Sequence, residues 1–191
     1  MKQNSLIDSV TIIYIYIMVH IISSNPTPGF KEDAKILTDK GYIPIQDLKK
    51  GDLVKTLKHD YKPIHMIGFS NIYHDERITQ QLYRCSPPAY PEVFEDLILT
   101  GCHSILVDVF ISREQREQTL ELSGDIYATD GRYRLPACLD ERASVYETEG
   151  TFTVYHLALE NTNMYVNYGI YANGLLVETC SKELSHMTLI E

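Results

Sequence analysis

Short apolar runs separated by turn-forming residues dominate the sequence from Ala34 onward, and this pattern limits the chain to a fold built from short strands. The first run, AKILT at 34–38, is followed by Asp-Lys-Gly at 39–41 and by a second run, YIPI, at 42–45. Gly and Asp favour tight turns, and Pro44 limits pairing of the second run because it has no backbone N–H. The same alternation predicts a mostly β fold, with further strands in 53–57, 62–70, 96–110, 145–149, 152–160 and 164–178.

One stretch, SREQREQTLEL at 112–122, has the composition of a helix rather than a strand. Ser112 is a good N-cap residue, and Gln115 stands at the capping-box spacing from it. The segment 74–96 contains SPPAYPE and follows no regular period, so we expect an irregular excursion there. No internal repeat is evident from the sequence. We therefore expect one short helix in an otherwise β-rich chain.

Length and charge narrow the classes of protein to consider. The 191 residues fit one domain, and 44% of them are hydrophobic, which is enough for a core. The net charge of −9 argues against nucleic acid as a partner, because phosphate binding requires clustered Lys and Arg. The nearest approach to a basic cluster is Lys49-Lys50, which fits a solvated turn. We expect a monomer that binds no nucleic acid and no cofactor.

The four cysteines are scattered along the chain, at Cys85, Cys102, Cys138 and Cys180, without a CxxC pair. Structural zinc sites normally show paired spacing, so we do not expect a metal. A disulfide framework is typical of shorter, cysteine-dense secreted chains. The cysteine pattern therefore favours free thiols in a reducing cytoplasm.

The first 28 residues differ from the rest of the chain. VTIIYIYIMVHII at 10–22 is apolar, with Lys2 before it and SSNPTP after it, which is the outline of a signal peptide or membrane anchor over 5–22. The run is shorter than the roughly 20 residues of a membrane-spanning helix, and its alternating Ile and Tyr equally suit a strand. NPTPG at 25–29 has the composition of an extended linker.

Two histidines and one cysteine are candidates for chemistry. His103 follows Thr100 by three residues at the junction of two apolar runs. A neutral imidazole beside an amide can protonate the leaving nitrogen, and a hydroxyl or backbone N–H can stabilise an oxyanion. His156 lies within a predicted strand, and Cys180 lies just past the last apolar run. Cys180 as nucleophile could pair with His103 as base, which would make the protein a cysteine hydrolase. All these residues equally suit a buried core, so alone they assign no activity.

Three blocks of sequence follow one another in an order that is characteristic of one family. They are GFKEDAKILTDKGYIPIQDLKKGDLVKT at 29–56, LILTGCHSILV at 97–107 and VYHLALENTNMYVNYGIYANGLLVETCS at 154–181. In this order they resemble the Hint domain of inteins and hedgehog autoprocessing proteins, which also occurs in bacterial processing domains and in large DNA viruses. The resemblance implies an all-β, horseshoe-like fold with three parts: a leader at 1–28, the Hint domain at 29–181 and a tail at 182–191.

The resemblance also implies a self-cleaving chemistry. In that family the first residue of the opening block is a Cys, Ser or Thr, which attacks the carbonyl of the preceding peptide bond and converts the amide into a thioester or ester. Thr100 and His103 match the TxxH motif that strains and protonates this amide. His156 occupies a position that is often Asp and could orient or relay a proton, and Cys180 matches the acceptor of full splicing. The implied reaction is a single-turnover autoproteolysis.

Three residues depart from the family pattern. Gly29 stands where the nucleophile belongs, so the implied N-to-S acyl shift at Pro28–Gly29 is disabled. Thr179 stands where splicing requires an Asn that cyclises, and Glu178 replaces the usual assisting His. The resemblance therefore implies N-terminal cleavage in a parent form and does not favour full splicing.

Several alternatives remain open at this point. Gly29 fits either an introduced Cys→Gly replacement or a natural loss of the nucleophile. In the parent form the chain's own N-terminal segment is the substrate, and water or an external nucleophile would complete the reaction, as in hedgehog-like processing. The rival interpretations are an inert pseudo-Hint domain with a structural or interaction role, and a cysteine hydrolase that uses Cys180.

Overall fold

The computed structural model describes residues 27–75, 81–182 and 188–190, and antiparallel β-strands are its main regular structure. The mostly β fold class predicted from the apolar runs is confirmed. The strands are β1 (Phe30–Lys31), β2 (Lys35–Thr38), β3 (Gly41–Pro44), β4 (Leu53–Lys55), β5 (Tyr61–His74), β6 (Leu82–Cys85), β7 (Leu97–Thr100), β8 (Ser104–Val107), β9 (Ala128–Thr129), β10 (Arg132–Pro136), β11 (Ser144–Val145), β12 (Gly150–Leu159), β13 (Gly169–Ala172), β14 (Leu175–Glu178) and β15 (Thr188–Leu189).

The predicted helix is present as α2 (Arg113–Ser123). The Ser112 side chain caps it by accepting a hydrogen bond from the backbone N–H of Gln115, at 3.0 Å. Gly124 ends the helix in the left-handed conformation, with φ of 75°. The Gln115 side chain also donates to the carbonyl of Leu139, at 3.1 Å, and so fastens the helix to the neighbouring 3-10 turn.

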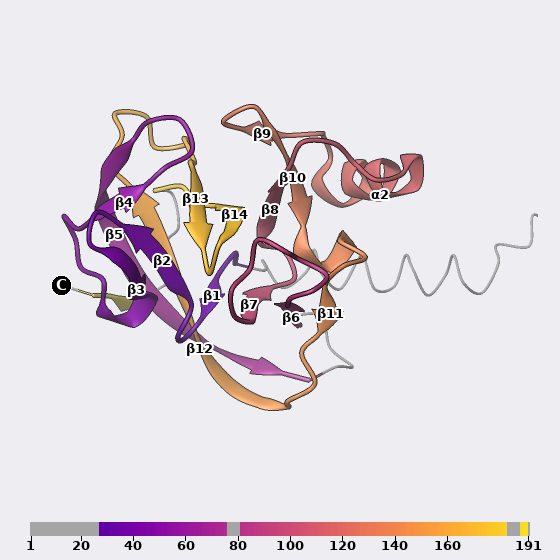
Figure 1. Cartoon of the computed structure of the whole chain (residues 1–191), viewed down its shortest axis with the longest axis horizontal. Helices are drawn as coiled ribbons and strands as arrows, with labels where there is room; N and C mark the ends of the chain where they lie inside the picture. Colours follow the sequence, from indigo (N-terminus) through magenta and orange to yellow (C-terminus); the bar gives the residue numbers. More distant parts are fainter. Residues whose placement is uncertain (1–26, 76–80, 183–187, 191) are drawn as a thin grey trace, which may run out of the picture.

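The C-terminal hairpin, β13 and β14, lies inside the sheet, between β2 and β8. The strand order is β11-β6-β7-β1-β12-β5-β4-β2-β13-β14-β8-β10-β9, with β3 beside β2 and β15 beside β5. In Figure 1 the hairpin (yellow) stands between β2, β4 and β5 on the left and β8, β10 and α2 on the right. The last long apolar run of the chain, which ends with β14, therefore lies between these two groups of elements.

Two segments contain the same local unit, although no repeat is evident in the sequence. β2 pairs with β3, whose last residue Pro44 leads into the 3-10 turn η1 (Ile45–Asp47), and β8 pairs with β10, whose Pro136 leads into η2 (Ala137–Leu139). The two prolines have nearly the same backbone angles, φ −54° and ψ 136° against φ −55° and ψ 136°. The sequence conceals this repeat because few side chains are shared between the two copies.

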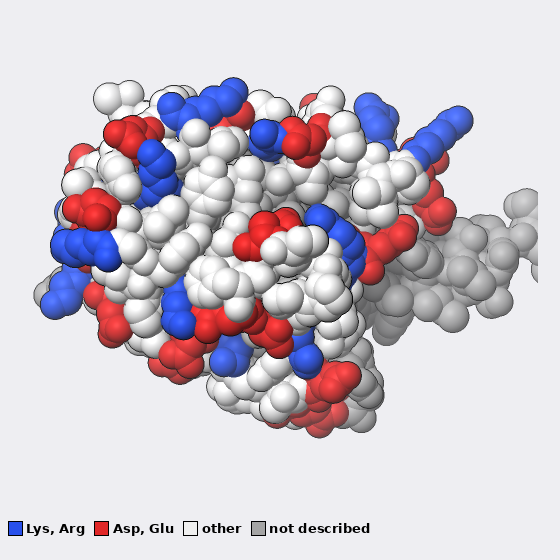
Figure 2. Space-filling model, in the orientation of Figure 1, with Lys and Arg blue, Asp and Glu red and all other residues white. Residues whose placement is uncertain are grey.

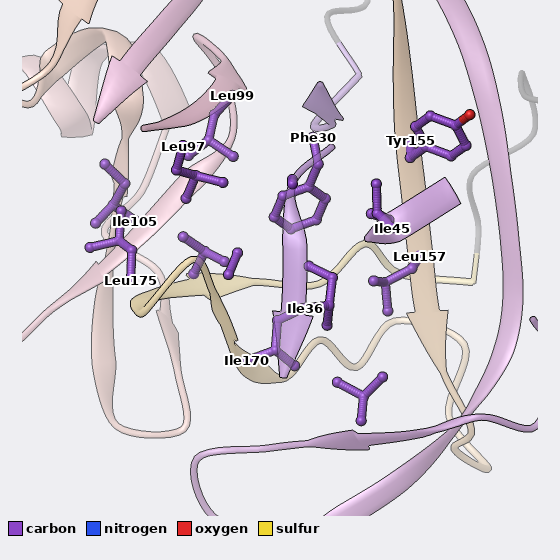
Figure 3. Close-up of a cluster of buried hydrophobic side chains, with 14 of the residues drawn as sticks. Phe30, Ile36, Ile45, Leu97, Leu99, Ile105, Tyr155, Leu157, Ile170 and Leu175 are labelled. Atoms are coloured by element: carbon purple, nitrogen blue, oxygen red, sulfur yellow. The ribbon is translucent and has the colours of Figure 1, made fainter. Parts of the chain in front are cut away.

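The hydrophobic core joins the N-terminal and C-terminal parts of the domain. Figure 3 shows the Phe30 ring in the middle of the cluster, with Ile36, Ile45 and Leu157 to one side. Phe30 is fully buried, and it directly follows Gly29 in the chain. Burying a side chain of this size stabilises the fold by about 2 kcal/mol. The core therefore holds the start of the domain firmly in place.

The predicted irregular excursion at 74–96 is more regular than expected, because it contains β6, which pairs with both β7 and β11. These partners are distant in sequence, so the local pattern of side chains does not reveal the strand. Conversely, residues 164–168 of the predicted strand region are not in a strand. Figure 2 shows Lys, Arg, Asp and Glu interspersed over the face in view.

The apolar N-terminal segment, 5–22, lies outside the described residues, as does most of the 1–28 leader. Within the described ranges, no helix has the length and apolar character needed to cross a membrane.

Candidate functional site

The peptide bond between Pro28 and Gly29 lies between two strands that carry candidate residues. β1 pairs with β7 on one side, where Phe30 is opposite Leu99, and with β12 on the other, where Phe30 is opposite Tyr155. This register brings Gly29 beside Thr100 at the end of β7 and beside His156 within β12. Thr100 and His156 are 56 residues apart in the sequence, and both lie beside the same peptide bond.

Thr100 holds the nitrogen side of this bond. Its Oγ1 accepts a hydrogen bond from the Gly29 N–H at 2.9 Å and lies 3.2 Å from the carbonyl of Thr27, to which it donates. The backbone N–H of Thr100 donates to the Gly29 carbonyl at 3.0 Å. Since a hydroxyl has one proton and here gives it to Thr27, Thr100 positions the bond but has no second proton for the leaving nitrogen.

His156 and Cys180 hold the carbonyl side of the same bond. His156 Nδ1 lies 2.6 Å from the Pro28 oxygen, and Cys180 Sγ lies 3.3 Å from it. A carbonyl oxygen only accepts, so Nδ1 carries a proton and donates it, as does the thiol. Two donors on one carbonyl oxygen are the arrangement that stabilises an oxyanion when that carbonyl is attacked.

Cys180 reaches this position because β14 ends two residues before it and its backbone N–H donates to the carbonyl of Leu157, at 2.9 Å. The side chain is 3% exposed, and burial raises the pKa of its thiol well above the ordinary value. A cysteine hydrolase requires an accessible thiolate. The structure therefore favours Cys180 as a hydrogen-bond donor and argues against the hydrolase alternative.

His103 is fully buried and packs against Phe30, with 4.4 Å between the ring centroids. Burial, with a smaller contribution from His156, lowers the pKa of His103 to about 3, and the carbonyl of Glu178 opposes this lowering. Neither ring nitrogen makes a hydrogen bond among the described residues. In this structure the Thr100 hydroxyl, not His103, makes the side-chain hydrogen bond to the Gly29 N–H, while the His103 imidazole packs against Phe30.

Gly29 is buried in contact with the His156 ring. A Cβ built on Gly29 would lie 2.8 Å from His156 Cε1, 3.1 Å from Nδ1 and 3.3 Å from the carbonyl of Tyr155. The backbone angles suit an L-residue, since Gly29 does not have positive φ. A side chain at position 29 thus needs a shift of the imidazole rather than a change of backbone.

The two residues before Cys180 have structural partners of their own. The Thr179 hydroxyl accepts from the backbone N–H of Tyr168, at 3.0 Å. The carboxylate of Glu178 pairs with Arg134 Nε at 2.6 Å and accepts from the hydroxyl of Thr129. Thr179 and Glu178 therefore fasten the end of β14 to neighbouring segments.

Loss of the Arg134 charge is expected to destabilise the domain, because the Glu178 side chain is 8% exposed and would keep an uncompensated charge. We expect Arg134→Met to lower the free energy of unfolding by about 2 kcal/mol, somewhat less than for a fully buried pair. The matched control is Arg113→Met, since Arg113 Nε and Glu117 are also 2.6 Å apart but their side chains are 88% and 51% exposed. That control should cost less than about 1 kcal/mol. Equal losses in urea denaturation would contradict a structural role for the Glu178 pair.

Sequence reasoning selected Thr100, His156 and Cys180, which the structure brings together, but it missed Ser70. The Ser70 hydroxyl lies 2.9 Å from Nε2 of His156. Ser70 falls at the end of a predicted strand, and nothing nearby marks it, since its contact depends on pairing between β5 and β12. All four cysteines are described and none forms a disulfide. Within the described ranges, no group of three or more Cys, His, Asp or Glu side chains could hold a metal ion.

Comparison with known proteins gives one family and a set of solved structures. No curated protein matches the chain. Similar structures include the gp41-1 intein, 13% identical over 79% of this chain and 98% of that one, with a TM-score of 0.45. A bacterial intein-like domain from Clostridium thermocellum is 16% identical over 80% and 98% of the two chains, with a TM-score of 0.47. A DnaB intein from Synechocystis sp. PCC 6803 is 15% identical over 81% and 99%, also with a TM-score of 0.47.

The family comparison covers the first two of the three sequence blocks, at 29–56 and 97–107. The family model described as "Hint domain" matches residues 28–122, about half of the chain. The matched region contains Gly29, Thr100 and His103, while His156 lies on β12 and Cys180 follows β14, two strands of the same sheet outside the matched region. The chain therefore belongs to the Hint-domain family.

Proposed function

We propose that this protein is a self-processing Hint domain whose substrate is its own Pro28–Gly29 peptide bond, and that Gly29 stops the first step. One observation carries the proposal: both polar groups of this single bond are held by side chains. Thr100 Oγ1 accepts from the nitrogen at 2.9 Å, while His156 Nδ1 and Cys180 Sγ lie 2.6 and 3.3 Å from the carbonyl oxygen.

With a thiol at position 29, the reaction begins with attack of its sulfur on the Pro28 carbonyl carbon. His156 and Cys180 stabilise the resulting oxyanion with two hydrogen bonds. The carbon–nitrogen bond then breaks, the thiol proton ends on the freed amine of residue 29, and a thioester joins Pro28 to the side chain of residue 29. Glycine has no atom that can perform the attack, so the reaction stops before its first covalent step.

Water would complete the reaction by hydrolysing the thioester, or an external nucleophile would accept the acyl group, so the expected outcome is cleavage rather than splicing. Release of a downstream segment would require a side-chain amide before Cys180, and Thr179 offers only a hydroxyl. That hydroxyl also accepts a backbone hydrogen bond from Tyr168 at 3.0 Å. Nucleic acid has no role in this proposal, and one monomer contains both catalyst and substrate.

The second candidate is a Hint domain that has kept the fold and lost the chemistry. One observation favours it: the His156 ring lies 2.8 Å from the point where a Cβ on residue 29 would be. The site is thus closely packed around a glycine. The two candidates differ in whether a thiol placed at position 29 can react.

Gly29→Cys tests the proposal directly. We expect the variant to cleave between residues 28 and 29, with added thiol accelerating release, and mass spectrometry to identify both fragments. The family role of His103 predicts that His103→Ala stops cleavage in this background. Gly29→Ala is the matched control: it meets the same imidazole contact at a cost of about 1–2 kcal/mol, but it should stay intact. A folded, intact Gly29→Cys chain would support the inert alternative instead.

A further inference from the structure

We infer that Ser70 is a positioning residue, whose hydroxyl holds the His156 ring in the one tautomer that donates a hydrogen bond to the Pro28 carbonyl. The inference rests on the proposed function for its catalytic meaning, but the hydrogen-bond arrangement is a property of the uncleaved chain. Nothing in the family motif or in the sequence pattern points to this serine.

The two ring nitrogens of His156 have different partners, and these partners assign the protons. Nδ1 lies 2.6 Å from the Pro28 oxygen, which cannot donate, so the proton of a neutral ring is on Nδ1. Nε2 is then an acceptor, and Ser70 Oγ, 2.9 Å away, supplies the hydrogen. Burial lowers the pKa of His156 below its ordinary value, which agrees with a neutral ring. The result is a directed chain from Ser70 through His156 to Pro28.

The strand pairing makes this chain rigid. His156 is opposite Gly68, and Ser70 is opposite Val154, within the long antiparallel pairing of β5 and β12. Ser70 and His156 are therefore diagonal neighbours on one face of the pair, at a separation that side chains can bridge. The glycine opposite His156 has no side chain to compete for its ring. Backbone pairing thus fixes both ends of the Ser70–His156 hydrogen bond.

A hydroxyl suits this position better than the groups that most often orient histidine. A carboxylate or carbonyl accepts a proton and so selects the ring tautomer that is protonated on the nitrogen facing it. At Nε2 such a partner would leave Nδ1 without a proton unless the ring became charged. Ser70 can donate, and Nδ1–H is then directed at the carbonyl of the scissile bond. Ser70→Ala removes this donor and leaves Nε2 buried without its partner.

The test is 15N NMR of the histidine ring nitrogens. It uses the unchanged chain, in which Gly29 prevents any reaction. We expect His156 to show a protonated Nδ1 and an unprotonated Nε2 at neutral pH. Ser70→Ala should shift the Nε2 resonance toward that of a nitrogen without a hydrogen bond, while Ser70→Thr, which keeps the hydroxyl, should leave it in place. A ring protonated on Nε2 in the unchanged chain, or an unaltered His156 spectrum in Ser70→Ala, would overturn the inference.

A kinetic comparison in the Gly29→Cys background separates positioning from stability. There we expect Ser70→Ala to slow cleavage about tenfold, because it removes the hydrogen bond that positions His156. Ser70→Thr should restore most of the rate. Equal rates for Ser70→Ala and its parent would overturn the catalytic meaning of the serine. Failure of Gly29→Cys to cleave, with the expected tautomer present, would instead count against the proposed function alone.

Discussion

In a Gly29→Cys chain, replacing His156 by phenylalanine is expected to slow cleavage about a hundredfold, the effect of removing one donor from an oxyanion site. Phenylalanine is somewhat larger than histidine and fills the space of the imidazole, but it has no N–H for the Pro28 oxygen, which His156 Nδ1 approaches to 2.6 Å. The rate of appearance of the fragment that begins at residue 29, followed by gel or mass spectrometry, measures the effect.

Cys180→Ala is the comparison for this prediction. It removes the other donor, whose sulfur is 3.3 Å from the same oxygen, but a thiol is a weak donor and the expected slowing is much smaller. The free energy of unfolding of both variants should be measured in a Gly29→Ala chain, which cannot cleave. Equal rates for His156→Phe and its parent, with the fold intact, would remove His156 from the reaction.

A second large effect is expected at the turn between β13 and β14. Gly174 has φ of +96°, and a Cβ added there would lie 2.0 Å from the backbone carbonyl oxygen of Glu92. Because a backbone oxygen cannot rotate away, the hairpin must move. We expect Gly174→Ala to lower the free energy of unfolding by about 4 kcal/mol, combining overpacking with an unfavourable backbone angle. Urea denaturation measures it.

Gly41 provides a matched control, because it has the same φ of +96° with nothing within 4 Å of its added Cβ. Gly41→Ala therefore carries the backbone penalty alone, about 1 kcal/mol. The difference between the two variants isolates the contact with Glu92. If both alanine variants lost the same stability, close packing of the turn against residue 92 would be refuted, whereas a Gly174→Ala chain that fails to fold would agree with it.

Much of the site could be predicted from the sequence because the family motif is local. Thr100 and His103 lie three residues apart, and Cys180 lies shortly after an apolar run. Their order along the chain, compared with the family, was enough to place Thr100 and Cys180 at the Pro28–Gly29 bond. Thr100 ends β7, which pairs with β1, and Cys180 follows β14, so the strand positions fix where these two side chains lie.

The remaining features depend on pairing between distant strands, which no local pattern encodes. Ser70 matters only because β5 and β12 align it with His156, and the packing of His103 against Phe30 depends on the pairing of β1 with β7. The strand β6 was missed for the same reason, since its partners are β7 and β11. Side-chain type suggested which residues could react, but only the register determines which atoms meet.

The repeated strand–proline–turn unit places one of the candidate residues, His103, opposite an inert counterpart in the other copy. In the first copy the carbonyl of Ala34 accepts from Ile45 N at 2.8 Å, and in the second the carbonyl of His103 accepts from Ala137 N at 2.9 Å. Ala34 and His103 therefore occupy equivalent positions in the two copies of the unit. One copy has an imidazole at this position, and the other has a methyl group. A residue that both units share is therefore required by the local fold, whereas a residue found in only one unit, such as His103, is a candidate for the chemistry.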